Sequence, residues 1–429
     1  MVVNRPMRIL WFVNASFPAV DKYLGKPEYL GTGWWMKATM AHMVSCENIE
    51  IAVAWASDVI HEYDKFSDDG AVYYLIPQHP VPDRKKNRIL SRLKRIFNAF
   101  KRHSYKNEIN YCVQTVNDFK PDLVHIWGTE NFYGLISNKI DVPVLIRIQG
   151  LIDEIKDNFW GGVKWFDRLS MPYEFIDYID MLHRAKHEVQ IFKQNNYFEG
   201  RTFWDHSHVR EHNVSAKYYD VPVMMRPLFF EKKWEINNIR RHSIYITARS
   251  MPAKGNDVLV KAVAIIKKYI PDIQLRIGGQ ITDSGYGKYL KKMVRDLGID
   301  HCVTFLGPVT ENDIIDELLN AHTYLFCSFV EGSCNSVIEA QLVGVPCVAA
   351  YVGGVTSLVT DMESGLFYPK GDSAMLAMSV RKIFANDDLA LTLSKGARKF
   401  AHNRFSQDKI INGTLSAYKD IVEQVHKKQ

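Results

Sequence analysis

The chain has 429 residues, which is enough for two or three domains with a large buried core. Hydrophobic residues make up 47% of it and charged residues 24%, as in ordinary globular proteins, and no run of 18 apolar residues occurs, which excludes a membrane-spanning helix. The formal net charge is +6, but ten Lys and Arg and no acidic residue lie between residues 84 and 106. Subtracting these ten leaves −4 for the rest of the chain, so the basic character is local.

Six cysteines are scattered through apolar, strand-like runs, without a C-x-x-C pair or a His/Cys cluster. This spacing predicts no zinc site and is typical of reduced core thiols in a cytosolic protein. The apolar run at residues 9–13 follows Arg5 and Arg8 but is too short for a signal peptide, so we expect it to be the first β-strand. The expected location is cytoplasmic, or peripheral on the inner face of the cell membrane.

The first half of the chain alternates β-type apolar runs with helical patterns, which predicts a parallel sheet covered by helices. Strands are expected at residues 7–13, 49–54, 72–76, 123–127 and 142–148, and helices at 34–43 and 107–119. The region 151–198 is helix-like, and the aromatic residues at its centre are either core residues or a surface for sugar stacking or lipid contact: Phe159, Trp160, Trp165 and Phe166.

Residues 84–106 combine the ten cations with an apolar stripe at helical spacing, which includes Leu93, Ile96 and Phe100. An ordinary surface helix is one interpretation, but nothing nearby offsets the repulsion between its cations. A helix lying on anionic lipid headgroups accounts for both faces and is the interpretation that we favour. We do not expect nucleic-acid binding, because Tyr and Trp are not interleaved with the basic residues and no RNA- or DNA-binding module accompanies them.

Candidate acceptor-binding residues occur in the same half. Glu130 follows the strand at 123–127 and is expected at the edge of a cleft, where its carboxylate suits an acceptor hydroxyl. His125 lies within that strand, where a lone histidine is more often a satisfied core residue than a substrate ligand. Four basic side chains further on are either a solvated helix face or a positive cluster for an acceptor phosphate: Arg201, His206, His208 and Arg210.

Residues 221–231 are the predicted connection to a second domain, in which strands and helices alternate throughout. This alternation indicates a doubly wound α/β fold. Strands are expected at 244–248, 273–277, 303–306 and 323–327, and helices at 257–270, 286–297 and 312–320. The predicted domains are therefore 1–225 and 226–407, both Rossmann-like, followed by a helix from 408 to 429.

Two cations lie in the first strand-to-helix turn of the second domain. Arg249 and Lys254 are five residues apart, with Pro252 between them and Gly255 after them. Their two positive charges match the two negative charges of a diphosphate. The sequence therefore predicts a diphosphate site at this turn.

The stretch 328–372 reads as strand end, loop, helix, strand and turn, with Glu331 in the loop and Glu339 inside the helix. The helix is expected to begin near Asn335, a favourable N-cap residue. A helix N-terminus at the carboxyl edge of a parallel sheet suits a phosphate, while carboxylates beside it suit neutral groups such as sugar hydroxyls. This pattern predicts a nucleotide-sugar site.

This stretch resembles the donor-binding signature of retaining glycosyltransferase family 4, E-G-x-x-N-x-x-x-E-A followed by G-x-P-V-V-A, G-G and G-L-x-x-P-x-G-D. The matching positions are Glu331, Gly332, Asn335, Glu339, Ala340, Gly344, Pro346, Gly353, Gly354, Gly365, Leu366, Pro369, Gly371 and Asp372. Arg249 and Lys254 resemble that family's G-R-x-x-x-x-K-G motif, with Ala248 in place of its first glycine. The resemblance implies the GT-B fold, two doubly wound Rossmann-like domains facing each other across a cleft, with the last helix returning to the first domain.

The resemblance also implies that a hexose-type sugar is transferred, with retention of configuration, from a nucleotide diphosphosugar (UDP-linked favoured) without a metal or other cofactor. Arg249 and Lys254 would neutralise the leaving diphosphate. Glu331 would bind sugar hydroxyls and steady the positive charge at the anomeric carbon, and Glu339 would hold the ribose diol. The other donor-binding positions that it implies are Gly33, Gly279, Gly307, Ser333, Asn335, Ser336 and Val337.

The acceptor is expected to be a glycan or a lipid-linked molecule at the membrane surface, as in polysaccharide or lipopolysaccharide synthesis. The chain departs from the family pattern at Trp127 and Gln149, where histidines are common, and at Ser357, where glutamate is common. A nucleotide-sugar epimerase of related fold and a non-catalytic carbohydrate-binding relative remain alternatives. A phosphorylase-like enzyme is a weaker one, because no motif for lysine-bound pyridoxal phosphate is present.

Overall fold

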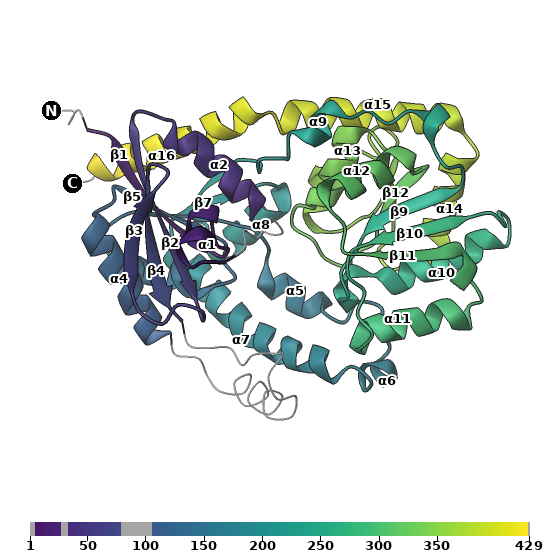
Figure 1. Ribbon diagram of the computed structural model, residues 1–429, viewed down its shortest axis with the longest axis horizontal. Helices are drawn as coiled ribbons and strands as arrows, with labels where there is room; N and C mark the ends of the chain where they lie inside the picture. Colours follow the sequence, from purple (N-terminus) through teal and green to yellow (C-terminus); the bar gives the residue numbers. More distant parts are fainter. Residues whose placement is uncertain (1–4, 27–32, 79–104, 428–429) are drawn as a thin grey trace.

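The computed structural model of the chain describes residues 5–26, 33–78 and 105–427, which form two α/β domains side by side (Figure 1). Each domain is built around its own mostly parallel sheet. The expected pair of Rossmann-like domains is therefore confirmed. Residues 84–104, which make up nearly all of the basic segment expected at the membrane surface, lie outside the described residues.

The first sheet has the strand order β3-β4-β2-β1-β5-β6-β7-β8, with β3 and β4 antiparallel and the other neighbours parallel. Residues 9–13 of the central strand are apolar and fully buried, and Ile9 pairs with Ile51 on one side and Leu123 on the other. The order reverses between β1 and β5, which opens a crevice at their carboxyl ends. The strands are β1 Met7–Val13, β2 Ile49–Ser57, β3 Asp64–Asp68, β4 Ala71–Pro77, β5 Leu123–Trp127, β6 Val144–Arg147, β7 Tyr197–Gly200 and β8 Lys217–Asp220.

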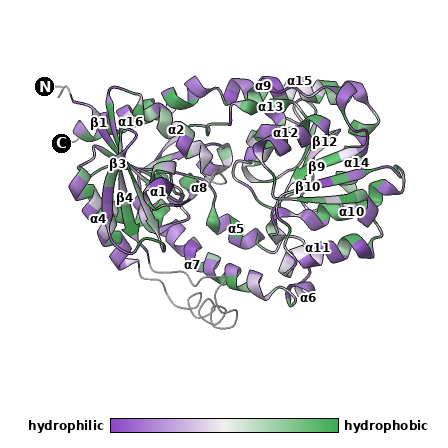
Figure 2. Cartoon of the chain, in the orientation of Figure 1, coloured by the Kyte–Doolittle hydropathy of each residue, from purple (hydrophilic) through white to green (hydrophobic). Residues whose placement is uncertain are grey.

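The second sheet is parallel throughout, in the order β11-β10-β9-β12-β13-β14. This is the classic doubly wound order, and its reversal point lies between β9 and β12. Hydrophobic residues run along these strands, as Figure 2 shows, because helices cover both faces of the sheet. The strands are β9 Ser243–Thr247, β10 Gln274–Gly278, β11 Val303–Gly307, β12 Thr323–Phe326, β13 Cys347–Ala350 and β14 Leu366–Tyr368.

Helices connect the strands in both domains, and none of the described helices is long and apolar enough to cross a membrane. In the first domain they are α1 Pro18–Tyr23, α2 Trp34–Val44, α4 Lys106–Phe119, η1 Phe132–Lys139, α5 Ile152–Asn158, α6 Trp165–Arg168, α7 Pro172–Gln194 and α8 Phe203–His212. Those that follow are α9 Leu228–Glu231, η2 Ile236–Asn238, η3 Pro252–Lys254, α10 Asn256–Lys267, α11 Gly285–Asp296, η4 Asp300–Cys302, α12 Glu311–Asn320, α13 Asn335–Val343, η5 Gly353–Ser357, α14 Ser373–Phe384, α15 Asp387–Arg404 and α16 Gln407–His426.

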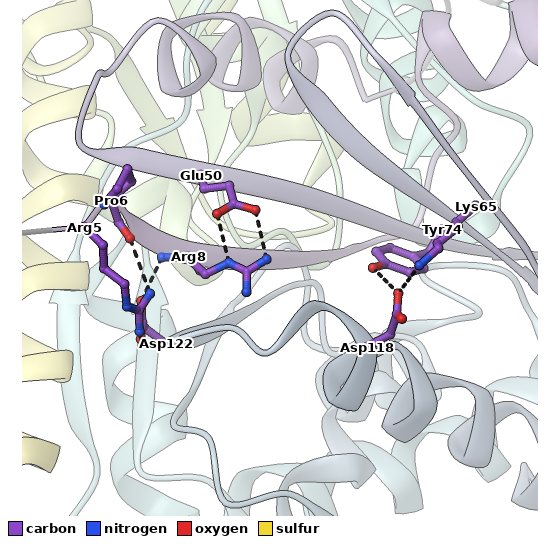
Figure 3. A network of polar contacts seen from close by, with 8 residues as sticks. All are labelled: Arg5, Pro6, Arg8, Glu50, Lys65, Tyr74, Asp118 and Asp122. Atoms are coloured by element: carbon purple, nitrogen blue, oxygen red, sulfur yellow. Dashed lines mark hydrogen bonds and ion pairs between the residues drawn. The ribbon is translucent and has the colours of Figure 1, made fainter. Parts of the chain in front are cut away.

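Polar side-chain contacts join neighbouring strands of the first sheet and tie the sheet to α4 (Figure 3). Arg8 of β1 donates from Nε and Nη2 to the two carboxylate oxygens of Glu50 on β2, both at 2.9 Å. Asp118 of α4 accepts from Lys65 of β3 and from the Tyr74 hydroxyl of β4, both at 2.7 Å. The second contact anchors β3, the antiparallel edge strand, to a helix that covers the sheet.

The C-terminal helix α16 returns to the first domain, and its Tyr418 is inserted into the core there. The Tyr418 hydroxyl accepts from Nε1 of Trp11 at 3.0 Å and lies 2.6 Å from Nδ1 of His125. Nε2 of His125 lies 3.2 Å from the buried Glu199 carboxylate. Burial lowers the pKa of His125 despite this carboxylate. His125 therefore belongs to a buried network that joins the first and last segments of the chain.

A second connection between the domains runs through α7 on the other side of the molecule (Figure 1). Glu174 at the start of α7 accepts a hydrogen bond from the backbone N–H of Tyr286 at 2.8 Å, in the first turn of α11. A carboxylate at a helix N-terminus satisfies a free N–H group and interacts favourably with the helix dipole. Tyr286 is fully buried in a cluster with Phe159 and Trp160, so the contact combines polar and apolar parts.

The elements predicted from the hydrophobic pattern are present, with bounds that agree to within a few residues. The strands β3, β7, β8 and the three-residue β14 were missed, as were the helices α1, α14 and α15. β3 and β8 are edge strands with few buried residues, and β7 is only four residues long, so none shows a clear apolar run.

Removing the Tyr418 hydroxyl is expected to lower the free energy of unfolding. Tyr418→Phe leaves the buried Trp11 N–H without its acceptor and His125 without its partner, which costs about 2 kcal/mol. Tyr351→Phe is the matched control, because that side chain is 62% exposed and its change should stay within about 0.5 kcal/mol. Urea unfolding followed by circular dichroism measures both, and equal stabilities would show that the network contributes nothing.

Candidate active site

A cavity of about 870 Å³ lies between the two domains, at the carboxyl edge of the second sheet. Most of its lining comes from the loops after β9, β10 and β12, and the first domain contributes Trp35, Gln149 and Arg201. In the described part of the chain its charged lining consists of three cations and one carboxylate: Arg201, Arg249, Lys254 and Glu331. The excess of positive charge suits an anionic ligand such as a diphosphate.

Lys254 and Glu331 form an ion pair across the reversal point of the sheet. Lys254 ends η3, which follows β9, and Glu331 follows β12, and Nζ lies 2.6 Å from Oε2. Burial acts to lower the pKa of Lys254, but the attraction and hydrogen bond of Glu331 outweigh it, so the pKa is raised. The lysine is therefore cationic at physiological pH, and the structure brings these two predicted residues together.

The backbones of these two loops are in contact, and this contact brings Lys254 and Glu331 close together. The N–H of Phe329 donates to the carbonyl of Ala253 at 2.7 Å. Gly255 has a φ of +67°, and a Cβ there would lie 2.0 Å from the carbonyl oxygen of Cys327. Only glycine fits this approach, so the glycine after Lys254 is a structural requirement of the site.

The third predicted charge, Arg249, also lines the cavity. Its side chain is exposed, and among the described residues it forms no ion pair. Its carbonyl accepts from Nδ2 of Asn256 at 3.0 Å, which holds the turn while leaving the guanidinium on the cavity side. Arg249 and Lys254 are thus both on the cavity wall, as the diphosphate prediction requires.

Helix α13 points its N-terminus into the cavity. Its N-cap is Cys334 without a side-chain capping bond, one residue earlier than predicted, so Asn335 belongs to the first turn. Ser333, Asn335 and Ser336 all line the cavity. Ser333 Oγ and Asn335 Oδ1 are buried without a hydrogen-bond partner among the described residues. Free backbone donors and unpaired side-chain atoms together indicate a polar ligand here.

The predicted donor glycines differ in position. Gly279 lines the cavity with a φ of +108°, and its N–H donates to the carbonyl of Gly307 at 2.7 Å. Gly307 itself lies behind the lining. Gly33 is the N-cap of α2 with a φ of +76°, and it is Trp35 of that helix that reaches the cavity wall.

Two other predicted donor residues lie beneath the lining. Val337 is fully buried, and Glu339 is 5% exposed. Oε1 of Glu339 accepts from Nη2 of Arg226 at 2.5 Å. Burial raises the pKa of Glu339, and Arg226 opposes that rise. The partner Arg226, which comes from the connection between the domains, was not predicted.

The candidate acceptor residues are not brought together. His125 lies in the buried core of the first domain, away from the cavity. Glu130 lies at the end of β5, where Oε1 accepts from Nδ2 of Asn14 at 2.8 Å and burial raises its pKa. Arg201 reaches the cavity and donates from Nη2 to the carbonyl of Gln149 at 2.8 Å.

Only two of the four basic side chains after residue 200 contact each other, since Nε of Arg210 donates to Nε2 of His206 at 3.3 Å while Arg201 lines the cavity. His206 stacks on Tyr218 with ring centroids 4.6 Å apart, and His208 lies 3.3 Å from the carboxylate of Glu211. Arg210 bonds the carbonyl of Val214. Arg201 precedes α8, whereas His206 and Arg210 lie four residues apart on one face of that helix.

The aromatic residues of 151–198 are divided between core and surface. Phe159 and Trp160 are buried against Tyr286, whereas Trp165 and Phe166 are 60% and 67% exposed. Near Glu130, the buried Glu188 accepts from Thr129 Oγ1 at 2.5 Å, and burial raises the pKa of Glu188 to about 7. No pattern in the sequence marked Glu188 or Trp35, because their roles depend on tertiary contacts.

Residues 230–400 match the family model described as "Glycosyl transferases group 1". The chain is 31% identical over 189 residues to a D-inositol 3-phosphate glycosyltransferase of Salinispora arenicola, over 43% of this chain and 42% of that protein. It is also 31% identical over 178 residues to the protein of that name from Saccharomonospora viridis, over 40% and 41% of the two chains. These matches span less than half of each relative.

Two solved structures cover nearly the whole chain. A sucrose-phosphate synthase from Thermosynechococcus elongatus has a TM-score of 0.71 at 16% identity, covering 97% of this chain and all of that one. Anabaena HepE in complex with UDP-glucose has a TM-score of 0.64 at 17% identity, covering 96% and 100%. At these identities the likeness concerns the fold alone, and it confirms the predicted GT-B fold.

Gly279→Ala is expected to destabilise the protein more than Gly298→Ala. Both glycines have positive φ, but a Cβ at Gly279 would lie 2.2 Å from the carbonyl oxygen of Ala248, whereas Gly298 has no atom within 4 Å. The shared backbone cost is about 1 kcal/mol, and the collision should add about 1–3 kcal/mol. Thermal unfolding of the two variants measures the difference, and equal shifts would contradict a close approach at Gly279.

Proposed function

We propose that this chain, whose residues 230–400 match the model of the group 1 glycosyl transferases, transfers a hexose-type sugar from a nucleotide diphosphosugar to an acceptor hydroxyl. A UDP-linked donor is favoured. The observation that carries the proposal is the interdomain cavity, where Arg249 and Lys254 lie on the wall beside the N-terminus of α13. This arrangement suits the diphosphate of such a donor.

The two cations would act mainly on the leaving group. As the bond to the anomeric carbon breaks, negative charge builds up on the diphosphate, and Arg249 and Lys254 stabilise that charge more than they stabilise the bound donor. Lys254 is held in place for this role by its contact with Glu331. We propose that no metal is needed, because the cations and the helix N-terminus meet the diphosphate charge.

Glu331 would face the transferred sugar. Its carboxylate accepts hydrogen bonds from sugar hydroxyls and stabilises positive charge at the anomeric carbon electrostatically. The acceptor hydroxyl would approach from the first domain, whose Gln149 and Arg201 line the same cavity. We propose net retention of configuration, with attack on the face from which the nucleotide leaves. HepE in complex with UDP-glucose is a neighbour whose ligand is consistent with a UDP-sugar donor.

Lys254→Ala is expected to lower kcat by at least about 100-fold while leaving the fold intact, because one cation that stabilises the leaving diphosphate is lost. Release of the nucleotide from a panel of UDP-, GDP- and ADP-sugars with candidate acceptors measures turnover. Glu331→Gln tests the opposite member of the pair. Retention is read from the anomeric configuration of the product by NMR.

Lys291→Ala is the matched control, since Lys291 of α11 forms an ion pair of the same length, 2.6 Å, with Asp283, and both residues lie outside the cavity lining. Its turnover should equal that of the wild type. Unchanged turnover in Lys254→Ala would contradict the assignment of the site. An isomerised donor sugar without transfer would indicate an epimerase, and nucleotide-sugar binding without turnover a non-catalytic relative.

We further propose that the acceptor is a glycan or a lipid-linked molecule at the membrane surface, and that residues 84–106 bind anionic lipid. The support is the sequence itself, ten cations with an apolar stripe. With such an acceptor the enzyme would work in the cytoplasm on the inner face of the cell membrane, in polysaccharide or lipopolysaccharide synthesis.

The wild type is expected to float with anionic liposomes, whereas a variant with Arg92, Lys94 and Arg95 changed to Glu should float much less. The three reversals change the local charge by six units, and each basic residue contributes roughly 1 kcal/mol near such a surface. Uncharged liposomes are the control for apolar adsorption. Equal flotation of the two proteins with anionic liposomes would disprove the lipid contact.

A further inference from the structure

Residues 221–225, which connect the domains, are buried and pack against two different hydrophobic clusters. Val223 and Met225 pack into the core of the second domain, while Val221 and Met224 pack in a separate cluster with α16. The segment ends at Arg226, whose backbone is biased toward an extended conformation because proline follows it. The backbone at Arg226 is therefore held in a fixed position between the domains.

The guanidinium of Arg226 contacts residues of four separate helices. Nη2 donates to Oε1 of Glu339 on α13 at 2.5 Å, and Nη1 lies 3.5 Å from Oε2 of Glu311 on α12. The group also lies 4.6 Å from the ring centroid of Phe229 and 5.6 Å from that of Trp34, the first residue of α2. Its side chain is only 17% exposed, so these contacts hold it in one orientation.

Arg226 is also the group that favours the ionised form of Glu339. Burial raises the pKa of this carboxyl, the nearby Glu311 raises it further, and Arg226 lowers it by attraction and by hydrogen bonding. An ionised carboxylate is purely an acceptor and can take both hydroxyls of a vicinal diol, whereas a protonated one has lost part of that capacity. Without the guanidinium, the balance at Glu339 shifts toward the protonated form.

We propose that Arg226 is a positioning residue for the nucleotide, which holds the Glu339 carboxylate oriented and charged to accept hydrogen bonds from the ribose hydroxyls of the donor. The inference rests on the proposed function. Arg226 does not line the cavity and acts through Glu339, which lies one turn below the cavity-lining Asn335 and Ser336 on the same face of α13. Because its guanidinium also packs on Trp34 of the first domain, ribose recognition depends on how the two domains are placed.

The test compares the binding of UDP and of 2′-deoxy-UDP by isothermal titration calorimetry. Arg226→Met should weaken UDP binding about tenfold, the size of one charge-assisted hydrogen bond. It should weaken 2′-deoxy-UDP binding less than about threefold, because that ligand lacks one of the two hydroxyls that Glu339 accepts from. A purely structural arginine would affect both ligands equally.

The loss caused by Arg226→Met should also depend on pH. Removing Arg226 moves the pKa of Glu339 further up, so the protonated fraction is larger at low pH and falls as the pH rises. The ratio of UDP dissociation constants, variant over wild type, should therefore decrease as the pH rises. Taking the ratio cancels the titration of UDP itself, which both proteins share.

Three control variants complete the design. Arg226→Lys keeps the charge but not the guanidinium geometry and should give an intermediate loss. Glu311→Gln removes the competing carboxylate and should not weaken UDP binding. Arg240→Met breaks an arginine–glutamate pair of 2.9 Å with Glu317, outside the cavity lining, and should bind UDP like the wild type. Thermal unfolding checks that each variant folds, and if Arg226→Met does not, Arg226→Lys carries the same ligand comparison.

Equal losses for UDP and 2′-deoxy-UDP, or no loss, would overturn the inference. That result is distinct from a failure of the proposed function. If the wild type neither binds UDP nor turns over any nucleotide sugar, the proposed function itself has failed. If the wild type is active and Arg226→Met binds UDP as tightly as it does, only the role of Arg226 has failed.

Discussion

The reversal of strand order between β9 and β12 is the constraint on which the candidate site depends. It places the loops that carry Lys254 and Glu331 opposite each other, so that a cation and a carboxylate meet at 2.6 Å. The pair is neutral by itself, which leaves the charge of the cavity to Arg249 and Arg201. A dianionic ligand is therefore attracted to a wall that already contains a preorganised lysine.

The loops can meet in this way because glycine occupies the points of contact. At Gly255 and at Gly279 a Cβ would lie 2.0 Å and 2.2 Å from a backbone carbonyl oxygen, and both residues have positive φ. Gly279 lies in the cavity wall itself, and Gly255 lies between the lining residues Lys254 and Asn256. The charged side chains attract an anionic ligand, whereas backbone packing determines the shape of the cavity.

Contacts between the domains determine which first-domain groups reach the cavity. Tyr418 joins the C-terminal helix to the first core, and Glu174 caps a helix of the second domain. The connection that ends at Arg226 is buried between the two. With these three tethers, Trp35 and Arg201 face the loops after β9, β10 and β12 across the cavity, although neither belongs to the domain that supplies most of the wall.

The sequence by itself determined the two α/β domains, because alternating apolar runs and helical patterns report local burial. It also predicted that Arg249, Lys254, Glu331 and the start of α13 lie at one sheet edge, because they occur in short motifs that follow the strands, and in the structure all of them line one cavity. The tertiary structure decided the rest. His125 was assigned to the core by Tyr418, 293 residues away, and Glu339 received its partner Arg226 from 113 residues away. Local periodicity shows that a residue is buried but not which distant group it meets, because that depends on how whole elements pack.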